Sequence, residues 1–355
     1  MSVTRPSPRA GDRGRSPASR PDYAGAVAHY TSPRRRDAVK RRWEEPLLRR
    51  LLGDVLGRVD VDPARPLKVL DVGCGTGGGL GLLDATAEVR RRPGPLEYVG
   101  LDLDPHLLAV AREQHADDPR ARFVEQDVRD GMGDPDVDVY LSTGVPWSHL
   151  TPDELRRALT HVLAAARHRD RPAAVVIDVL GRYSLEWPTR WASSRWTYRM
   201  SFFEGDDEPP TAEMTTYGGS ELLALVAGAA EDADCPLAHL RAVDRSLLVG
   251  RHSATGDYAP DLPPVRSLVN ELWDPEVNAE LPRLRLGVDL PPAPPEIVAF
   301  HAAFVERWNR AVAEAGTTPA PQAELAERLR ELEARHQRGL GTGHSLTVTA
   351  ITRPA

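Results

Sequence analysis

The residues best suited to chemistry in this sequence form a glycine-rich segment, Asp71 to Gly79, which overlaps the end of the apolar run Leu67 to Val72. Because glycine has no side chain, Gly73, Gly75 and Gly77 let a ligand approach the backbone closely. A helix that begins there would present free N–H groups to the ligand. The segment therefore predicts a cofactor-binding turn between a strand and a helix.

Two cofactor classes fit this turn. Gly73, Gly75 and Gly78 satisfy the generic Gly-x-Gly-x-x-Gly pattern of dinucleotide-binding proteins. Asp71 precedes the first glycine by two residues, where its negative charge would repel a pyrophosphate but attract an ammonium group. The acid therefore favours S-adenosylmethionine, which has an ammonium at its methionine end, and leaves a nicotinamide dinucleotide as the alternative.

Two further acids follow the next two apolar runs of the chain. Asp102 ends the run Tyr-Val-Gly-Leu-Asp, and Asp127 follows Phe-Val-Glu-Gln. Asp102 can accept hydrogen bonds from ribose hydroxyls, because a carboxylate accepts at both oxygens. Asp127 can accept one from an adenine amine while Val128 packs on the ring. Ligands of open α/β sheets bind outside the carboxyl ends of the strands, so the acids predict one crevice for an adenosine-containing cofactor.

Short runs with strand character alternate with helical stretches around these motifs. The stretches Pro105 to His115 and Thr151 to Arg167 carry apolar residues at helical spacing, and Thr151 and Pro152 form a typical helix start. This alternation indicates a doubly wound α/β fold with a seven-stranded, mostly parallel sheet. The expected strands are Leu67 to Val72, Tyr98 to Leu103, Arg122 to Glu125, Val137 to Ser142, Ala173 to Val179, Leu237 to Val249 and Ser345 to Ile351.

The rest of the chain is organised around this core. The first 22 residues combine Arg, Pro, Ser and Gly without apolar periodicity, which is typical of a disordered tail. Helices are expected near Val265 to Trp273, Pro295 to Ala315 and Pro321 to Gln337. The expected segments are a tail at 1–22, an N-terminal helical cap at 23–64, the core at 65–253 with an aromatic lid at 182–204, a helical insertion at 254–343, and the last core strand at 344–355.

Composition narrows the function classes. The 355 residues carry a formal net charge of −7, which argues against nucleic acid as the main partner. No apolar run approaches the roughly 20 residues that span a bilayer, and the N-terminus has no apolar stretch typical of a secretory signal. We therefore expect a soluble, cytoplasmic protein without a membrane partner. Two cysteines provide no disulfide framework or cysteine-based zinc site, and we assign no metal and no oligomeric state.

Taken together, these motifs resemble those of the class I S-adenosylmethionine-dependent methyltransferases, over roughly residues 23–249 and the final strand. The resemblance implies a Rossmann-like fold, S-adenosylmethionine as the cofactor, and methyl transfer as the reaction. It also implies that the glycine turn holds the methionine end and that Ser142 to Gly144 lie beneath the sulfonium. Tyr30 is expected to close over the cofactor. The implied cofactor-binding residues are Tyr30, Asp71, Gly73, Cys74, Gly75, Gly77, Asp102, Leu103, Asp127, Val128, Ser142, Thr143 and Gly144.

The candidate catalytic residue is His149, which follows the fourth strand near the expected position of the methyl donor. A histidine can act as a general base near neutral pH. The alternative is that His149 caps or packs against the helix that begins near Thr151.

Five residues are candidates for binding the acceptor. Trp147 follows the expected position of the methyl donor. Tyr183 and Trp187, together with Trp191, can wall an aromatic pocket, although aromatic residues near a sheet end also form ordinary core. Arg251 and His252 can pair with an acidic acceptor group, and the alternative for them is a solvated surface.

The leading hypothesis is methyl transfer to O, N or C of a small molecule in bacterial secondary metabolism, with the 254–343 insertion covering the acceptor site. One alternative is methylation of RNA or protein, which the basic cluster between Arg34 and Arg42 can support. A second alternative is a non-catalytic protein of the same fold that acts as a binding partner.

Overall fold

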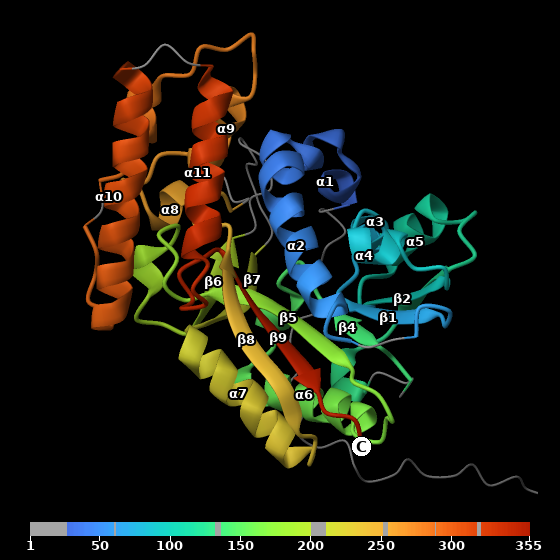
Figure 1. Cartoon of the computed structure of the whole chain (residues 1–355). Helices are drawn as coiled ribbons and strands as arrows, with labels where there is room; N and C mark the ends of the chain where they lie inside the picture. Colours follow the sequence, from blue (N-terminus) through green and yellow to red (C-terminus); the bar gives the residue numbers. More distant parts are fainter. Residues whose placement is uncertain are drawn as a thin grey trace, which may run out of the picture.

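A mostly parallel sheet forms the centre of the fold (Figure 1). The computed structural model describes residues 27–59, 62–131, 136–199, 211–250, 255–287, 289–317 and 321–355. The strands are β1 (Leu67–Val72), β2 (Leu96–Asp102), β3 (Ala121–Glu125), β4 (Val139–Leu141), β5 (Ala174–Gly181), β6 (Arg195–Arg199), β7 (Thr211–Tyr217), β8 (Leu237–Arg245) and β9 (Ser345–Thr352).

The strand order places the glycine turn at the point where the chain changes direction across the sheet. From β1 the chain winds outward through β2 to β3, and it then returns to pair β4 with the other side of β1. All these pairs are parallel, as is β4 with β5. Such a switch point opens a crevice at the carboxyl ends of the strands. The doubly wound α/β fold is confirmed.

The end of the chain returns to the sheet as expected. Strand β9 pairs antiparallel with β5 over Ala174–Leu180, and β8 pairs antiparallel with β9. Every residue of β9 is buried. The loop before β9 is held by Asp244, whose carboxylate accepts hydrogen bonds from the Leu340, Gly341 and Thr342 N–H groups.

The sheet holds nine strands instead of the expected seven, because β6 and β7 form a hairpin that the sequence analysis did not anticipate. Strand β7 pairs with β5 only at Leu180 and Gly181, so the hairpin extends the sheet beyond the carboxyl end of β5. In β6, Trp196 and Tyr198 are buried between partly or fully exposed neighbours, the alternation of a half-buried strand. Because the segment 182–204 is rich in aromatic residues, it was expected to form a lid, and the strand alternation within it was not recognised.

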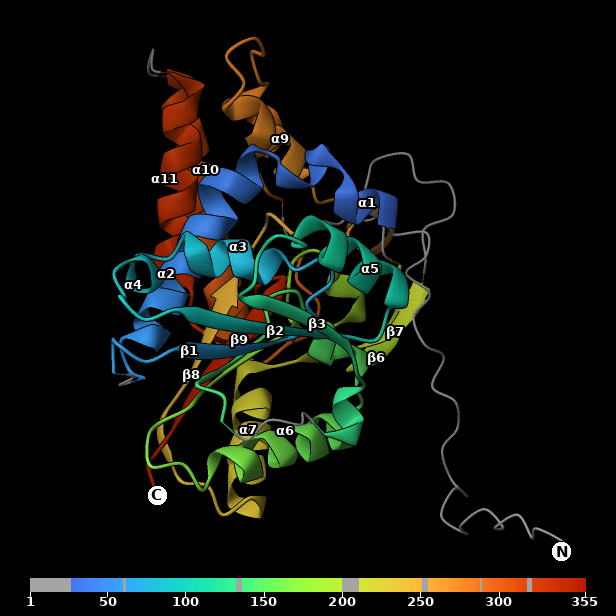
Figure 2. The same cartoon turned by 90° about the vertical axis from the view of Figure 1, so that its right-hand side faces the viewer.

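Helices cover both faces of the sheet, as the two views show (Figures 1 and 2). Successive residues of β1 point to opposite faces of the sheet. Val69 packs with α2 and α3 on one face, and Leu70 packs with α6 and α7 on the other. Helix α6 begins with the expected cap, in which Thr151 and Glu154 form a capping box. These helices are α1 (Val27–Thr31), α2 (Glu45–Leu56), α3 (Gly78–Asp84), α4 (Ala87–Arg90), α5 (Pro105–Gln114), α6 (Pro152–Ala166) and α7 (Gly219–Asp232).

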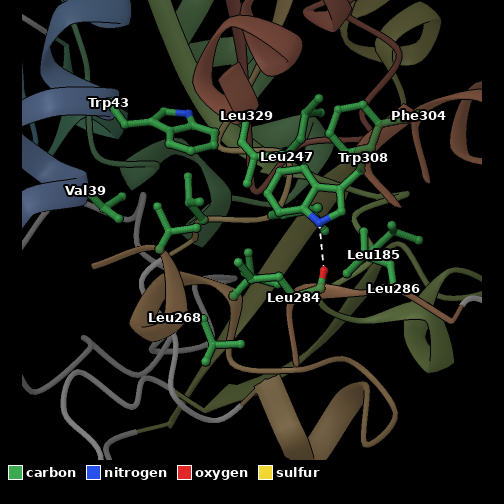
Figure 3. Packing of buried hydrophobic residues seen from close by; sticks show 14 of the residues in the cluster. Val39, Trp43, Leu185, Leu247, Leu268, Leu284, Leu286, Phe304, Trp308 and Leu329 are labelled. Atoms are coloured by element: carbon green, nitrogen blue, oxygen red, sulfur yellow. Dashed lines mark hydrogen bonds between the residues drawn. The ribbon is translucent and has the colours of Figure 1, made fainter. Parts of the chain in front are cut away.

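A second group of helices stands at the carboxyl edge of β5 and β8, where α10 and α11 lie side by side (Figure 1). A large apolar cluster joins them to the N-terminal segment and to the loops after β5 and β8. Trp308 lies in this cluster and donates its indole N–H to the Leu284 carbonyl at 2.8 Å (Figure 3). The helices are α8 (Thr255–Tyr258), α9 (Val265–Leu272), α10 (Pro295–Thr317) and α11 (Gln322–His336).

A nearly buried arginine on α9 ties the N-terminal segment to this second group. Arg266 donates to both carboxylate oxygens of Asp37, at 2.8 and 2.9 Å. It also donates to Glu44 at 3.1 Å and to the Val249 carbonyl at 2.6 Å. A bidentate guanidinium–carboxylate pair fixes orientation as well as distance, so Arg266 sets the position of the N-terminal segment.

Replacing this arginine is expected to destabilise the fold strongly. Arg266→Leu leaves Asp37 and Glu44 without their main cation, a situation that typically costs about 3–5 kcal/mol. Urea unfolding would measure the loss. The control is Arg328→Ala, which removes an exposed pair with Glu314 and should cost at most about 1 kcal/mol. Equal losses of unfolding free energy in the two variants would contradict the role of Arg266 in holding the N-terminal segment.

Candidate functional site

The glycine turn brings three segments together at the carboxyl end of β1. Gly73 and Gly75 have φ of +68° and +54°, a region that side chains disfavour. A Cβ on Gly73 would lie 2.4 Å from the Pro146 side chain, and one on Gly75 would lie 3.8 Å from the Tyr30 ring. The absence of a side chain on Gly73 therefore lets the loop after β4 approach the turn, while Tyr30 of the N-terminal segment lies near Gly75 at ordinary van der Waals distance.

Asp71 lies beneath the turn, with only 2% of its surface exposed. The Tyr98 hydroxyl donates a hydrogen bond to its carboxylate at 2.5 Å, and Gly79 of α3 covers the same oxygen. Burial raises the pKa of Asp71 to about 7; the bond from Tyr98 lowers it in part, and the charge of Asp102 adds to the rise. Asp71 thus holds the turn from below, and its contact with an ammonium group stays a prediction.

Asp102 is attached directly to the turn from the end of β2. One carboxylate oxygen accepts a hydrogen bond from the Gly75 N–H at 2.8 Å, and the other accepts from the Asp104 N–H at 3.0 Å. Burial raises its pKa, and these bonds, with a further one from Leu103, counteract the rise. A carboxylate oxygen has two acceptor sites. Asp102 therefore keeps acceptor capacity for ribose hydroxyls, beside Leu103.

Asp127 carries a partner that the sequence analysis missed. Arg129 donates to its carboxylate from Nε at 2.9 Å and from a second nitrogen at 2.5 Å, and it also reaches Glu154. Val128 is half-buried against the apolar cluster on the α6 side. In the sequence, the position of Arg129 two residues after Asp127 was the feature that could have indicated this pair. An adenine amine at Asp127 would have to share this carboxylate with Arg129.

The loop after β4 is strained and contains an unsatisfied hydroxyl. Val145 has φ of +59°, which is rare for a β-branched residue. Ser142 is 1% exposed, and its hydroxyl has no hydrogen-bond partner among the described residues. Thr143 is half-buried and Gly144 is exposed. Strain and orphaned polar groups are concentrated at functional sites, so this loop fits the expected position beneath a sulfonium.

The candidate base, His149, ends a short 3₁₀ turn, Pro146–His149. Burial lowers the pKa of His149 to about 4, and the positive charge of Arg195 contributes. The imidazole is therefore neutral at pH 7 but a weak proton acceptor, because a general base works best with a pKa near the operating pH. Its neighbour Trp147 is 3% exposed and belongs to the apolar cluster beneath the sheet.

The described part of the aromatic segment, 182–199, packs as core. Trp187 is 1% exposed and donates its indole N–H to the Gly181 carbonyl. Tyr183 contacts the Trp191 ring edge to face, at 5.7 Å between centroids. The packing of Trp187 agrees with the alternative of ordinary core, and the role of this segment as a lid stays a prediction. Arg251 and His252 lie outside the described residues.

A buried acid–histidine pair near this segment was not anticipated. Glu186 accepts a hydrogen bond of 2.5 Å from the His344 ring, and both side chains are at most 9% exposed. Trp187 meets the His344 ring edge to face. The two residues are 158 positions apart in the chain, so no spacing in the sequence could have paired them.

The described residues fit an adenosine cofactor with an amino-acid end. Asp102 offers acceptors beside a glycine cradle, Tyr30 lies above Gly75, and the buried Ser142 hydroxyl lacks a partner within the described chain. A doubly wound sheet with such a cradle at its switch point is typical of α/β proteins that bind nucleotide-containing cofactors.

Comparison with known proteins assigns a domain type to part of the chain. A family model described as a methyltransferase domain matches residues 69–169. The chain carries a methyltransferase domain of the class I S-adenosylmethionine-dependent type, and its cofactor is S-adenosylmethionine. No curated protein matches the sequence significantly.

Several solved structures share low sequence identity with the chain. S-adenosylmethionine-bound CalS10, an amino pentose methyltransferase from Micromonospora echinaspora, is 21% identical, with 64% of this chain and 93% of that chain covered and a TM-score of 0.37. An S-adenosylmethionine-dependent methyltransferase from Clostridium acetobutylicum is 13% identical, with 63% and 91% covered and a TM-score of 0.41. The [4+2]-cyclase SpnF is 14% identical, with 86% and 80% covered and a TM-score of 0.38. Likenesses at these TM-scores say nothing about the substrate.

Among the described residues, no helix has the length and apolar character needed to cross a membrane. In the same part of the chain, no three His, Cys, Asp or Glu residues form a group that could hold a metal ion.

The bond between Tyr98 and Asp71 predicts a pH-dependent effect on stability. The pKa of Asp71 in the folded protein, about 7, lies above its ordinary value of 3.8. Between these values the folded state holds a proton that the unfolded chain has released, so stability falls as the pH rises through this window. Tyr98→Phe removes a bond that favours the ionised carboxylate. We expect it to cost about 1.5–3 kcal/mol at pH 8 and less at pH 5.

Urea unfolding of both proteins at the two pH values measures this difference. Tyr258→Phe is the matched control, because the Tyr258 hydroxyl accepts from the Arg199 N–H and donates to no carboxylate among the described residues. Its cost should be the same at both pH values. A cost of Tyr98→Phe that does not change with pH would contradict the assigned titration of Asp71.

Proposed function

We propose that the protein transfers the methyl group of S-adenosylmethionine to O, N or C of a small molecule, in the cytoplasm of a bacterium and as part of secondary metabolism. The observation that carries the proposal is the bond between the Gly75 N–H and Asp102, which joins the glycine cradle to the ribose acceptor. The match of residues 69–169 to a methyltransferase domain supports the reaction class.

Each part of the crevice has a distinct task in this proposal. Bound S-adenosylmethionine would supply a methyl carbon that its sulfonium has already activated for in-line displacement. Asp102 holds the ribose, and the Gly73 to Gly77 turn accommodates the methionine end. Asp71 fixes the turn from below and, in its ionised form, adds negative charge near the ammonium. Tyr30 covers the turn on the solvent side, and the Ser142 hydroxyl is available to a polar group of the cofactor.

Catalysis in this arrangement depends mainly on positioning. A donor carbon that is already activated needs an acceptor atom held in line with it and shielded from water. The aromatic segment and the insertion helices α9 to α11 pack together in one apolar cluster at this end of the sheet, and the acceptor is proposed to bind at the edge of this cluster that faces the crevice. His149 is neutral at pH 7 and remains the proposed base, of low strength.

The alternative of RNA methylation has less support from the basic N-terminal cluster. Three of its arginines already have partners within the protein: Arg35 stacks on Tyr30, Arg36 pairs with Glu45 and Arg42 lies over the Trp273 ring. Much of the cluster still lies at the surface, since the Arg36 side chain is 66% exposed, and the main argument against phosphate binding is the net charge of −7. Salt-dependent binding of tRNA would nevertheless revive this alternative.

Calorimetric titration with S-adenosylhomocysteine, the by-product of methyl transfer, tests the cofactor site without requiring an acceptor. We expect micromolar binding by the native protein. Asp102→Ala should weaken it by about 10- to 150-fold, since it removes a charge-assisted hydrogen bond of about 1.5–3 kcal/mol. Gly75→Val should abolish binding, because its side chain would fill the cradle.

The control is Asp232→Ala on α7, which removes an exposed acid paired with Arg156 and should bind like the native protein. If Asp102→Ala binds S-adenosylhomocysteine as tightly as the native protein does, Asp102 does not bind the ribose. No binding by the native protein would favour a non-catalytic partner protein, and binding of NAD instead would favour a dehydrogenase.

A further inference from the structure

A buried glutamate of α11 holds the loop that follows β8. Glu333 is only 1% exposed. Its two carboxylate oxygens accept hydrogen bonds from the Ser246 and Leu247 N–H groups, at 2.9 and 3.0 Å. Ser246 has φ of +54°, a region that side chains disfavour. The strained backbone of this loop is therefore held by an acid from the insertion.

The same serine connects Glu333 with the N-terminal segment. The Ser246 hydroxyl donates to the Glu44 carboxylate at 3.2 Å. Arg266 and Lys40 bind that carboxylate as well, at 3.1 and 3.6 Å. Glu44 closes the stretch of chain that begins with α1 and carries Tyr30. Two acids from distant parts of the chain thus meet at one serine.

The two acids disfavour each other's ionised form. Burial raises the pKa of Glu333 to about 7, and the charge of Glu44 adds to the rise, while the Trp43 indole and the two loop N–H groups lower it in part. At pH 8 both carboxylates are ionised and repel each other. Near pH 6 Glu333 holds a proton, and this repulsion is absent.

Other titratable groups packed around Glu333 have partners of their own. They come from α10, from the end of α11 and from the loop before β9, where the His344 N–H donates to the Ser246 carbonyl. These pairs are His301 with the Tyr183 carbonyl, Arg307 with His336, and His344 with Glu186. Glu44 is therefore the charged group that links Glu333 with the N-terminal segment.

Release of the N-terminal segment would separate the two acids. Water would then reach Glu333, and its pKa would return toward the ordinary value of 4.5. The attached arrangement thus binds a proton more tightly than the released one. By linkage, attachment is favoured at low pH and loses this advantage as the pH rises through about 7.

We propose that Glu333 is a positioning residue which, through Ser246 and Glu44, sets how firmly the N-terminal segment closes over the cofactor, so that cofactor affinity falls as the pH rises from 6 to 8. The inference rests on the proposed function and assigns a regulation to the same site. Tyr30 transmits the effect, because its ring lies 3.8 Å from the position of a Cβ on Gly75. Helix α1, which carries Tyr30, also contacts α5 (Figure 2).

Calorimetric titration with S-adenosylhomocysteine at pH 6 and pH 8 tests this proposal. Glu333→Gln has a neutral side chain of the same size, and thermal unfolding verifies that it folds. The ratio of the dissociation constants at pH 8 and pH 6 should be about threefold or more larger in the native protein than in Glu333→Gln. Asp71 titrates in the same range in both proteins, so the comparison removes its effect.

Glu44→Gln provides a second variant. It removes the opposing charge, while its amide oxygen can still accept from Arg266 and Ser246. It should lower the ratio of dissociation constants in the same way.

Hydrogen exchange at pH 8 gives a readout without a ligand. Amide groups of residues 27–44 should exchange faster in the native protein than in Glu333→Gln, because the ionised acid loosens the segment. A role of Glu333 that is only structural predicts the opposite, since the variant would then lose a contact.

The matched control is Glu331→Gln on the same helix, an exposed acid paired with Arg335; it should keep the native ratio. Equal ratios in the native protein and Glu333→Gln, or faster exchange of residues 27–44 in the variant, would overturn the inference while the proposed function stands. Failure of the native protein to bind S-adenosylhomocysteine at either pH would instead overturn the proposed function, and this inference with it.

Discussion

The hydrogen bond from the Gly75 N–H to the Asp102 carboxylate joins the carboxyl ends of β1 and β2 at the centre of the site. It requires a backbone N–H that points across the crevice, which the positive φ of Gly75 provides. The same acid then has acceptor sites left for a ribose. This bond, together with those from the Gly73 and Cys74 N–H groups to the Leu101 carbonyl, fixes the turn against the end of β2. The N-terminal segment and the β4 loop are arranged around it.

The outer parts of the protein reach the site through buried polar contacts. Arg266 on α9 holds Asp37 and Glu44, and the segment that contains these acids follows α1, which carries Tyr30. Glu333 on α11 accepts hydrogen bonds from the Ser246 and Leu247 N–H groups in the loop after β8. Because a buried carboxylate needs its donors in place, helices from the insertion influence loops at the carboxyl edge of the sheet.

Much of the fold and of the cofactor site could be predicted from the sequence. The strand–helix alternation predicted the doubly wound sheet, and a final strand at Ser345–Thr352 follows from its own apolar alternation. Asp102 lies at the glycine turn because the ends of neighbouring parallel strands share one edge. The hairpin of β6 and β7 could not be predicted in the same way, since its short pairing with β5 depends on contacts distant in sequence.

The sequence by itself therefore determined the local chemistry: a glycine turn, acids at strand ends and a capped α6, each encoded by residues that lie close together in the chain. Only the tertiary structure decided which groups are partners. In the folded protein Asp71 accepts a hydrogen bond from Tyr98, Asp127 pairs with Arg129, and Glu186 and His344 form a buried pair. Ionisation and hydrogen bonding depend on burial and on neighbours brought in from other elements. Those are properties of the packed chain, and no residue spacing specifies them.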